Sequence, residues 1–174
     1  DDDLKKDALL QELKGKTSTT IDGRSVHVYA NIGGPADLGS VNENDAEGVG
    51  LFRSEFLFLD RADAPSVEEQ TETYTKVFEA FGSRKVVVRT LDAGGDKVLA
   101  YFDSAVETNP ALGLRSTRFT LRHPEIFDRQ LRAILRASAD CDAVRIMFPM
   151  IGSIDEWRLA RARFNHCATQ VMAE

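Results

Sequence analysis

The chain has 174 residues, of which 43% are hydrophobic and 29% are charged, and its formal net charge is −6. This length and balance are typical of a soluble globular domain with one core, and no apolar run is long enough to span a bilayer. The excess of acid disfavours nucleic acid and anionic membranes as partners, so local arginines must hold any anionic ligand. The acidic start lacks the basic and apolar parts of a secretion signal, which predicts a cytoplasmic location.

The N-terminal segment predicts a helix, a hairpin and a second, shorter helix. Leucines on one face, followed by Gly15, indicate an amphipathic helix that ends at the glycine. Asp22-Gly23 lies between two β-branched stretches, so we expect a hairpin whose return strand runs from Val26 into "ANIGG". A short helix is expected to follow from Pro35. We assign residues 1–18 to a linker helix and residues 19–174 to the main domain.

Short apolar strands then alternate with amphipathic helices. The strand signals are "GVGLFRSE" (48–55), "KVVVRT" (85–90) and "AVRIMFPM" (143–150). The helix signals are residues 65–82, residues 109–122, a helix after His123-Pro124 with Phe127, Leu131, Ile134 and Leu135 on one side, and a last helix from Ser153 to Val171.

Capping residues mark the helix ends. Ser66 with Glu69, and Ser153 with Glu156, form the spacing of a capping box, in which serine and glutamate each satisfy a backbone N–H group. Asn109 before a proline is a plausible cap for the third helix. These signals predict that the helices begin close to the strand ends, with short connections.

The order of about four βα units predicts an α/β fold with a parallel sheet. Strands rich in valine, isoleucine, leucine and methionine are typical of strands buried on both faces. No G-x-G-x-x-G or P-loop pattern follows a strand, so neither nucleotide fingerprint is supported. The pattern fits an open doubly wound sheet or part of a closed (β/α) barrel.

Two arginines end predicted strands: Arg53 ends "GVGLFR" and Arg89 ends "VVVR". Ligands bind at this edge of a parallel sheet in either architecture, and a guanidinium is a rigid donor fork for carboxylate or phosphate. Gly94 after the second strand allows a tight turn with accessible N–H groups. The alternative is that each arginine pairs with a neighbouring acid, Glu55 or Asp92, and only holds a loop.

The remaining candidate residues are interpreted as structural or exposed. Three arginines share one face of a predicted helix, which is usually a solvated surface, and neither the histidines nor the cysteines show catalytic or metal-binding spacing. These residues are Arg115, Arg118, Arg122, His27, His123, His166, Cys141 and Cys167.

Five segments, in order and at these spacings, carry a resemblance to a known family. They are "EGVGLFRSEFLFLDR", "VVVRTLDAGGDK", "NPALGLRSTR", "LRAILRAS" and "VRIMFPMI". Together they closely resemble the phosphoenolpyruvate–protein phosphotransferases, enzyme I of the bacterial sugar phosphotransferase system. Pyruvate phosphate dikinase and phosphoenolpyruvate synthase share the arginine motifs and stay open as an alternative, as does a non-catalytic module that binds phosphoenolpyruvate and self-associates.

The resemblance implies a TIM (β/α)8 barrel that binds phosphoenolpyruvate and magnesium. The family passes the phosphoryl group to a histidine on its own N-terminal domain and then to a histidine-containing carrier protein for sugar uptake. The family's substrate-binding arginines match Arg53 and Arg89, and Arg115 matches a third arginine near the phosphate.

By the same resemblance, the chain holds the first half of the barrel and none of the catalytic residues. The metal ligands and an acid-donating cysteine are expected on later strands, past Glu174, so we expect no metal site in this chain and no phosphoryl transfer by the chain alone. Its first and fourth strands would have open edges. We expect a homo-oligomer through these edges, or the N-terminal helix as their cover.

Overall fold

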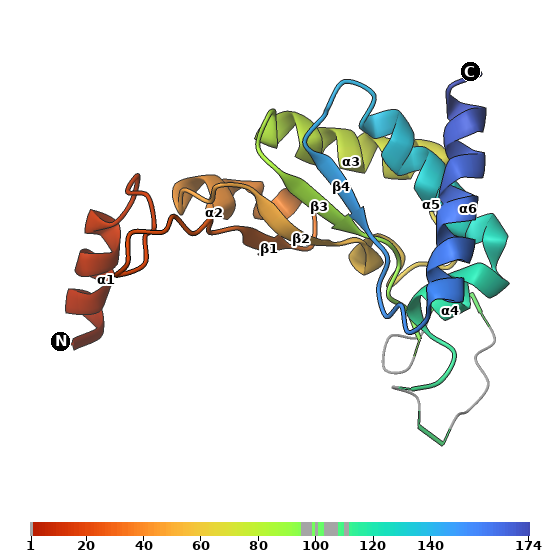
Figure 1. The fold of residues 1–174 in the computed structure, drawn as a ribbon, viewed down its shortest axis with the longest axis horizontal. Coiled ribbons are helices and arrows are strands. Elements are labelled where there is room, and N and C mark those ends of the chain that lie inside the picture. The colour runs from red at the N-terminus through yellow and green to blue at the C-terminus, as the bar shows by residue number, and fades with distance from the viewer. Residues whose placement is uncertain (1, 95–98, 100, 103–107, 110–111) are drawn as a thin grey trace.

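A computed structural model describes residues 2–94, 99, 101–102, 108–109 and 112–174 (Figure 1). The helices and strands, in chain order, are α1 (Asp2–Glu12), β1 (Ala30–Ile32), η1 (Pro35–Asp37), α2 (Leu38–Glu43), β2 (Val49–Arg53), η2 (Ser54–Leu57), α3 (Val67–Phe81), β3 (Val86–Arg89), α4 (Ser116–Arg122), α5 (Pro124–Ala137), β4 (Val144–Met147) and α6 (Ile154–Val171).

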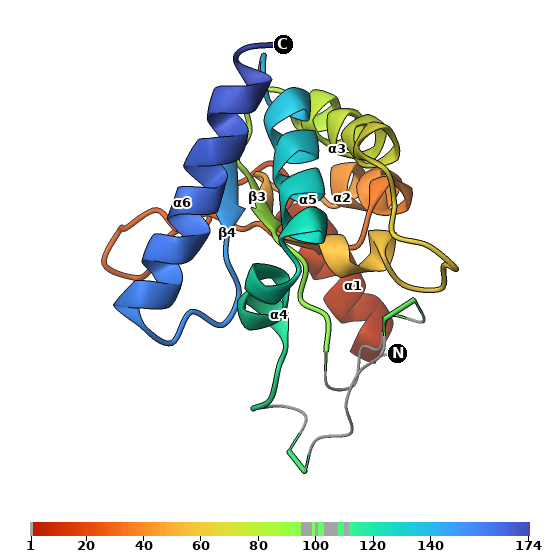
Figure 2. The same ribbon diagram turned by 90° about the vertical axis from the view of Figure 1, so that its right-hand side faces the viewer.

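The four strands form one parallel sheet in the order β1-β2-β3-β4. A doubly wound sheet reverses its strand order at a switch point, and this order has no reversal. Helices α3, α5 and α6 lie on the same side of β3 and β4 (Figures 1 and 2). The prediction of parallel βα units that form half of a barrel is therefore confirmed, and the doubly wound alternative is not observed.

The main core lies between the sheet and the helices. Val86 and Val88 of β3 are fully buried against α3 and α5, whereas Val87 and Arg89 are partly exposed. Successive strand residues point to opposite faces, so Arg89 lies on the face away from the helices. The other members of this core are Ile32, Val41, Val49, Phe52, Tyr74, Val77, Phe78, Phe81, Ala133 and Ile134.

The predicted hairpin forms only as a tight turn. Thr19 and Ser25 make a single antiparallel bridge, and Thr20 N–H donates to the Arg24 carbonyl at 2.8 Å. The return strand does not begin at Val26, because the chain pairs with β2 only from Ala30 onward. A two-stranded hairpin without a packed face is marginal in water, and residues 16–28 are exposed.

The third predicted helix begins later than its sequence cap indicates. Residues 112–115 are not helical, and α4 begins at Ser116, whose N–H donates to the Ala93 carbonyl at 2.8 Å. This bond holds the chain against the end of β3, and Arg115 is extended. The interpretation that Arg115 shares a solvated helix face with Arg118 and Arg122 is therefore wrong; residues 110–111 lie outside the described ranges.

The serine caps form as predicted, with one difference. Ser66 and Glu69 make the complete capping box at the start of α3. Ser153 accepts from Glu156 N–H at 3.1 Å, but the Glu156 carboxylate accepts from Gly152 N–H at 2.7 Å.

Helix α1 lies apart from the four strands in Figure 1, so it covers neither edge of the sheet. The idea that the N-terminal helix covers the open edges is therefore wrong, and the division of the chain at residue 18 stays a prediction. Within the described ranges, no helix combines the length and apolar character needed to cross a membrane.

Replacing Ser66→Ala is expected to lower the free energy of unfolding by about 0.5–2 kcal/mol, because the Glu69 N–H loses its acceptor. Urea unfolding followed by circular dichroism measures the change. Ser83→Ala, at an exposed position just after α3, is the control and should leave stability unchanged. Equal stability of the two variants would contradict the prediction.

Candidate anion-binding site

The sheet register places the two predicted arginines side by side. Arg53, the last residue of β2, is the register partner of Arg89, the last residue of β3. Neighbouring strands lie about 4.8 Å apart, so both side chains start from the same edge of the sheet. This is the carboxyl edge, where ligands bind in parallel α/β folds.

Arg89 is held by two carboxylates. Its Nη2 lies 2.5 Å from Glu55 Oε1, and its Nη1 lies 3.3 Å from Asp92 Oδ2. Glu55 is completely buried, so the pair fixes the guanidinium at the strand end. For Arg89, the alternative that the arginine braces a loop thus holds in part. Its Nε is also buried and has no hydrogen-bond acceptor among the described residues.

Arg53 differs from Arg89 in its charge environment. Its guanidinium lies over the Phe56 ring, 4.7 Å from the centroid, and it makes no ion pair with any other described residue. Its buried Nε has no acceptor within the described part of the chain. Glu55, the acid that could have neutralised it, is the partner of Arg89. Arg53 therefore keeps donors and a positive charge for an anion.

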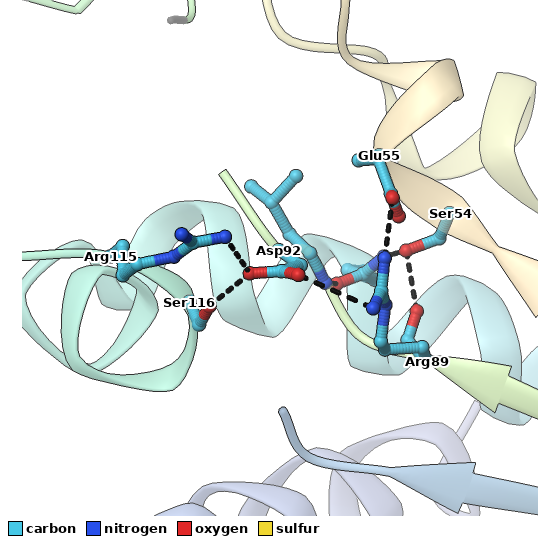
Figure 3. A network of polar contacts seen from close by, with 8 residues as sticks. Ser54, Glu55, Arg89, Asp92, Arg115 and Ser116 are labelled. Atoms are coloured by element: carbon cyan, nitrogen blue, oxygen red, sulfur yellow. Dashed lines mark hydrogen bonds and ion pairs between the residues drawn. The ribbon is translucent and has the colours of Figure 1, made fainter. Parts of the chain in front are cut away.

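Asp92 brings the third predicted arginine into the same cluster. Arg115 Nη2 lies 3.2 Å from Asp92 Oδ1, and the Ser116 hydroxyl donates to that same oxygen. Asp92 consequently lies between Arg115 and Arg89 (Figure 3). The structure thus gathers all three arginines that the sequence selected as substrate-binding candidates: two are strand neighbours, and the third is joined through one carboxylate.

Gly94 permits the approach of Arg115. The glycine has φ +109°, and a Cβ there would lie 2.6 Å from Arg115 Cβ. The sequence predicted a tight turn at this position. The structure adds a second reason for glycine, which is that the segment before α4 packs directly against it.

The charges of the cluster favour an anion. Burial raises the pKa of Asp92, but hydrogen bonds from Ser116 and Arg115 and the charges of Arg89 and Arg115 outweigh it, so the pKa is lowered. The strand-end residues named above include three guanidinium groups, those of Arg53, Arg89 and Arg115, and two carboxylates, those of Glu55 and Asp92, which pair with Arg89 and Arg115. Three minus two leaves a formal charge of +1, within a chain whose net charge is −6.

Polar residues that the sequence interpretation missed support the cluster. Ser54, Ser116 and Gln130 are fully buried. The Ser54 hydroxyl donates to the Arg89 carbonyl, the Ser116 hydroxyl donates to Asp92, and Gln130 accepts from the N–H group of Leu91, two residues after Arg89. One signal was available, because Gln130 interrupts the apolar side of the helix between Phe127 and Leu131. A polar residue in such a stripe indicates a buried hydrogen-bonding role.

The histidines and cysteines make contacts of a structural kind. His27 Nδ1 lies 2.6 Å from Glu47 Oε2, and the His123 ring packs against Phe119 with centroids 4.5 Å apart. Cys167 is buried, and burial raises the pKa of its thiol to about 11. These contacts agree with the structural interpretation of the three side chains.

The described residues do not fit a magnesium site. No three histidine, cysteine, aspartate or glutamate side chains of the described ranges come together in a way that could hold a metal ion. The two acids of the cluster, Glu55 and Asp92, already bind arginines.

Comparison with known proteins gives a family and several close relatives. Residues 7–174 match the model of the family described as "PEP-utilising enzyme, PEP-binding domain". Over 153 residues, or 88% of the chain, it is 53% identical to the phosphoenolpyruvate-protein phosphotransferase of Staphylococcus carnosus and covers 26% of that protein. The corresponding protein of Staphylococcus aureus is 50% identical with 27% covered, and that of Latilactobacillus sakei is 48% identical with 26% covered. The chain spans about a quarter of the length of the curated relatives that it matches.

Replacing Asp92→Asn is expected to lower the free energy of unfolding by about 1–3 kcal/mol at pH 7, because Arg89 and Arg115 lose a charged acceptor. The pKa of Asp92 is lowered in the folded state, so its contribution is present above the unfolded pKa of about 3.9 and is lost as pH falls through the folded pKa. The difference between wild type and variant should therefore shrink in acid.

Urea titrations at a series of pH values test this, with Asp142→Asn, at an exposed loop position, as the control. A difference that stays constant from pH 7 down to the acid limit of folding would show that the carboxylate charge is not what stabilises the cluster.

Proposed function

Because the chain belongs to the PEP-utilising enzymes, whose PEP-binding domain matches residues 7–174, we propose that it is the phosphoenolpyruvate-binding part of a phosphoenolpyruvate–protein phosphotransferase. Relatives at 48–53% identity carry that name, which supports this enzyme over a dikinase or a synthase. The reaction class is phosphoryl transfer from phosphoenolpyruvate to a protein histidine.

One observation carries the proposal: Arg53 and Arg89 are register neighbours at the carboxyl edge of the sheet. Phosphoenolpyruvate is a small molecule with a carboxylate and a phosphate, so it offers two anionic groups to two adjacent guanidinium forks. The unpaired donors of Arg53 and the buried Nε–H of Arg89 suit such a ligand. Arg115, behind Asp92, adds positive charge beside the phosphate.

The contribution of these residues to the reaction is binding and charge neutralisation. Phosphoryl transfer depends mostly on positioning and on stabilising negative charge in the transition state, and fixed guanidinium groups do both. Glu55 and Asp92 hold Arg89 in place, so little reorganisation is needed when the anion arrives.

The proposal includes the phosphoryl acceptors, the cellular location and the metal that the family resemblance implies. The phosphoryl group goes to a histidine on an N-terminal domain of the same enzyme and then to a histidine-containing carrier protein, in the cytoplasm. The resemblance also implies magnesium for the complete barrel, where it would neutralise charge on the phosphate and would be held by residues other than the described ones. The chain by itself binds phosphoenolpyruvate without turnover.

Arg53→Ala is expected to weaken phosphoenolpyruvate binding by about 10-fold to 100-fold, which is the loss of one charge-assisted contact of about 1.5–3 kcal/mol. Isothermal titration calorimetry of wild type and variant measures it. The melting temperature should change little, because Arg53 forms no ion pair with another described residue.

Two further variants complete this experiment. Arg89→Lys is used in place of Arg89→Ala, since removal of the cation beside buried Glu55 would cost about 3–5 kcal/mol of stability. Arg145→Ala is the control, because Arg145 is an exposed strand arginine that donates to its own loop. Equal affinity of wild type and the Arg53 variant would show that Arg53 does not bind the substrate.

Self-association of the chain is expected, because β1 and β4 each have one side without a strand partner in the described sheet. Sedimentation equilibrium should show dimers or larger species at micromolar concentration. A monomer throughout that range, with β4 amides protected from hydrogen exchange, would exclude pairing through this edge.

A further inference from the structure

The side chain of Gln130 is a buried polar group in the apolar side of α5. It is completely inaccessible and lies between the buried residues Phe127, Leu131 and Ile134. An amide buried without partners would destabilise the fold, so its hydrogen bonds show what it does.

Gln130 bonds to both arginine-bearing strand ends. Its Oε1 accepts from Leu91 N–H at 2.8 Å, and its Nε2 donates to the Ser54 hydroxyl at 2.9 Å and to the Tyr74 hydroxyl at 3.0 Å. Ser54 Oγ in turn donates to the Arg89 carbonyl at 2.5 Å, which is among the contacts drawn in Figure 3.

These bonds connect residues adjacent to the two arginines. Ser54 directly follows Arg53, and Leu91 lies two residues after Arg89. The backbone pairing of β2 with β3 ends at these arginines, so beyond this point the strand ends have no ladder to keep them together. The Gln130–Ser54–Arg89 chain of bonds continues the connection by side chains.

We infer that Gln130 is a positioning residue that sets the separation of Arg53 and Arg89, and thereby the spacing of the anionic groups that the site accepts. The inference rests on the proposed function, since it assigns the two arginines to one ligand. A glutamine suits this role because its amide offers a donor and an acceptor at once. A glutamate would lose the donor, and an asparagine is one methylene shorter.

The Tyr74 hydroxyl belongs to the same buried network. Tyr74 lies on α3, its hydroxyl accepts from Gln130 Nε2 at 3.0 Å and also hydrogen-bonds with Ser54, and burial raises the pKa of this hydroxyl. Removing this contact weakens the core between α3 and α5. Removing the Ser54 contact breaks the connection to Arg89.

The test uses the side-chain Nε–H resonances of Arg53 and Arg89 in the ligand-free chain, followed by calorimetric titration with phosphoenolpyruvate. Gln130→Met keeps the volume and removes all three bonds, and Ser54→Ala removes one side of the connection. Both variants are expected to shift or broaden the two arginine resonances and to weaken binding about 10-fold, or about 1.4 kcal/mol.

One control lowers stability without touching the strand ends. Gln70→Met removes a buried glutamine of α3 whose Nε2 donates to the Pro65 carbonyl at 3.2 Å. This variant is expected to lower the melting temperature and to leave the arginine resonances and the affinity unchanged.

Unchanged arginine resonances in Gln130→Met and Ser54→Ala would overturn the inference, and if Gln130→Met does not fold, Ser54→Ala decides alone. Arginine resonances that move equally in Gln70→Met would also overturn it, because Gln130 would then act only through stability. If the wild-type chain binds no phosphoenolpyruvate, the proposed function fails, and the resonances still decide the role of Gln130.

Discussion

The parallel pairing of β2 with β3 is the constraint on which the rest of the site depends. It brings Arg53 beside Arg89 at the edge of the sheet, on the face away from the covering helices. Two cations so close repel each other; the apolar core holds the sheet, and Glu55 and Asp92 offset the charge of Arg89. The folding energy of the βα units therefore helps to hold two arginines side by side at this edge.

The charges of the two arginines, each partly buried, are stabilised by different contacts. Arg89 is neutralised by Glu55 and Asp92, which fix its direction, whereas Arg53 rests on an aromatic ring and forms no ion pair with another described residue. A guanidinium held in one direction can orient an anion, and a guanidinium without an ion pair can give more binding energy to an anion. The loop-brace interpretation therefore fits Arg89, whereas ligand contact by the strand-end arginines stays a proposal.

Segments distant in sequence complete the arrangement. Gly94 lets the backbone before α4 come close enough for Arg115 to reach Asp92, and Gln130 of α5 connects the ends of β2 and β3. The buried hydrogen bonds of these residues are satisfied only in this arrangement, so the site and the helix packing stabilise each other.

The sequence by itself determined the parallel α/β class, the strands that end in Arg53 and Arg89, and the family, because apolar periodicity, caps and motif spacing are local properties. Only the tertiary structure decided that Glu55 pairs with Arg89 and that Arg115 lies before the helix and pairs with Asp92. It also decided that the Asp22-Gly23 hairpin has a single bridge. Each of these depends on which distant groups meet when the core closes. A buried charge takes the partner that the packing brings to it, and a hairpin extends only if another surface covers it.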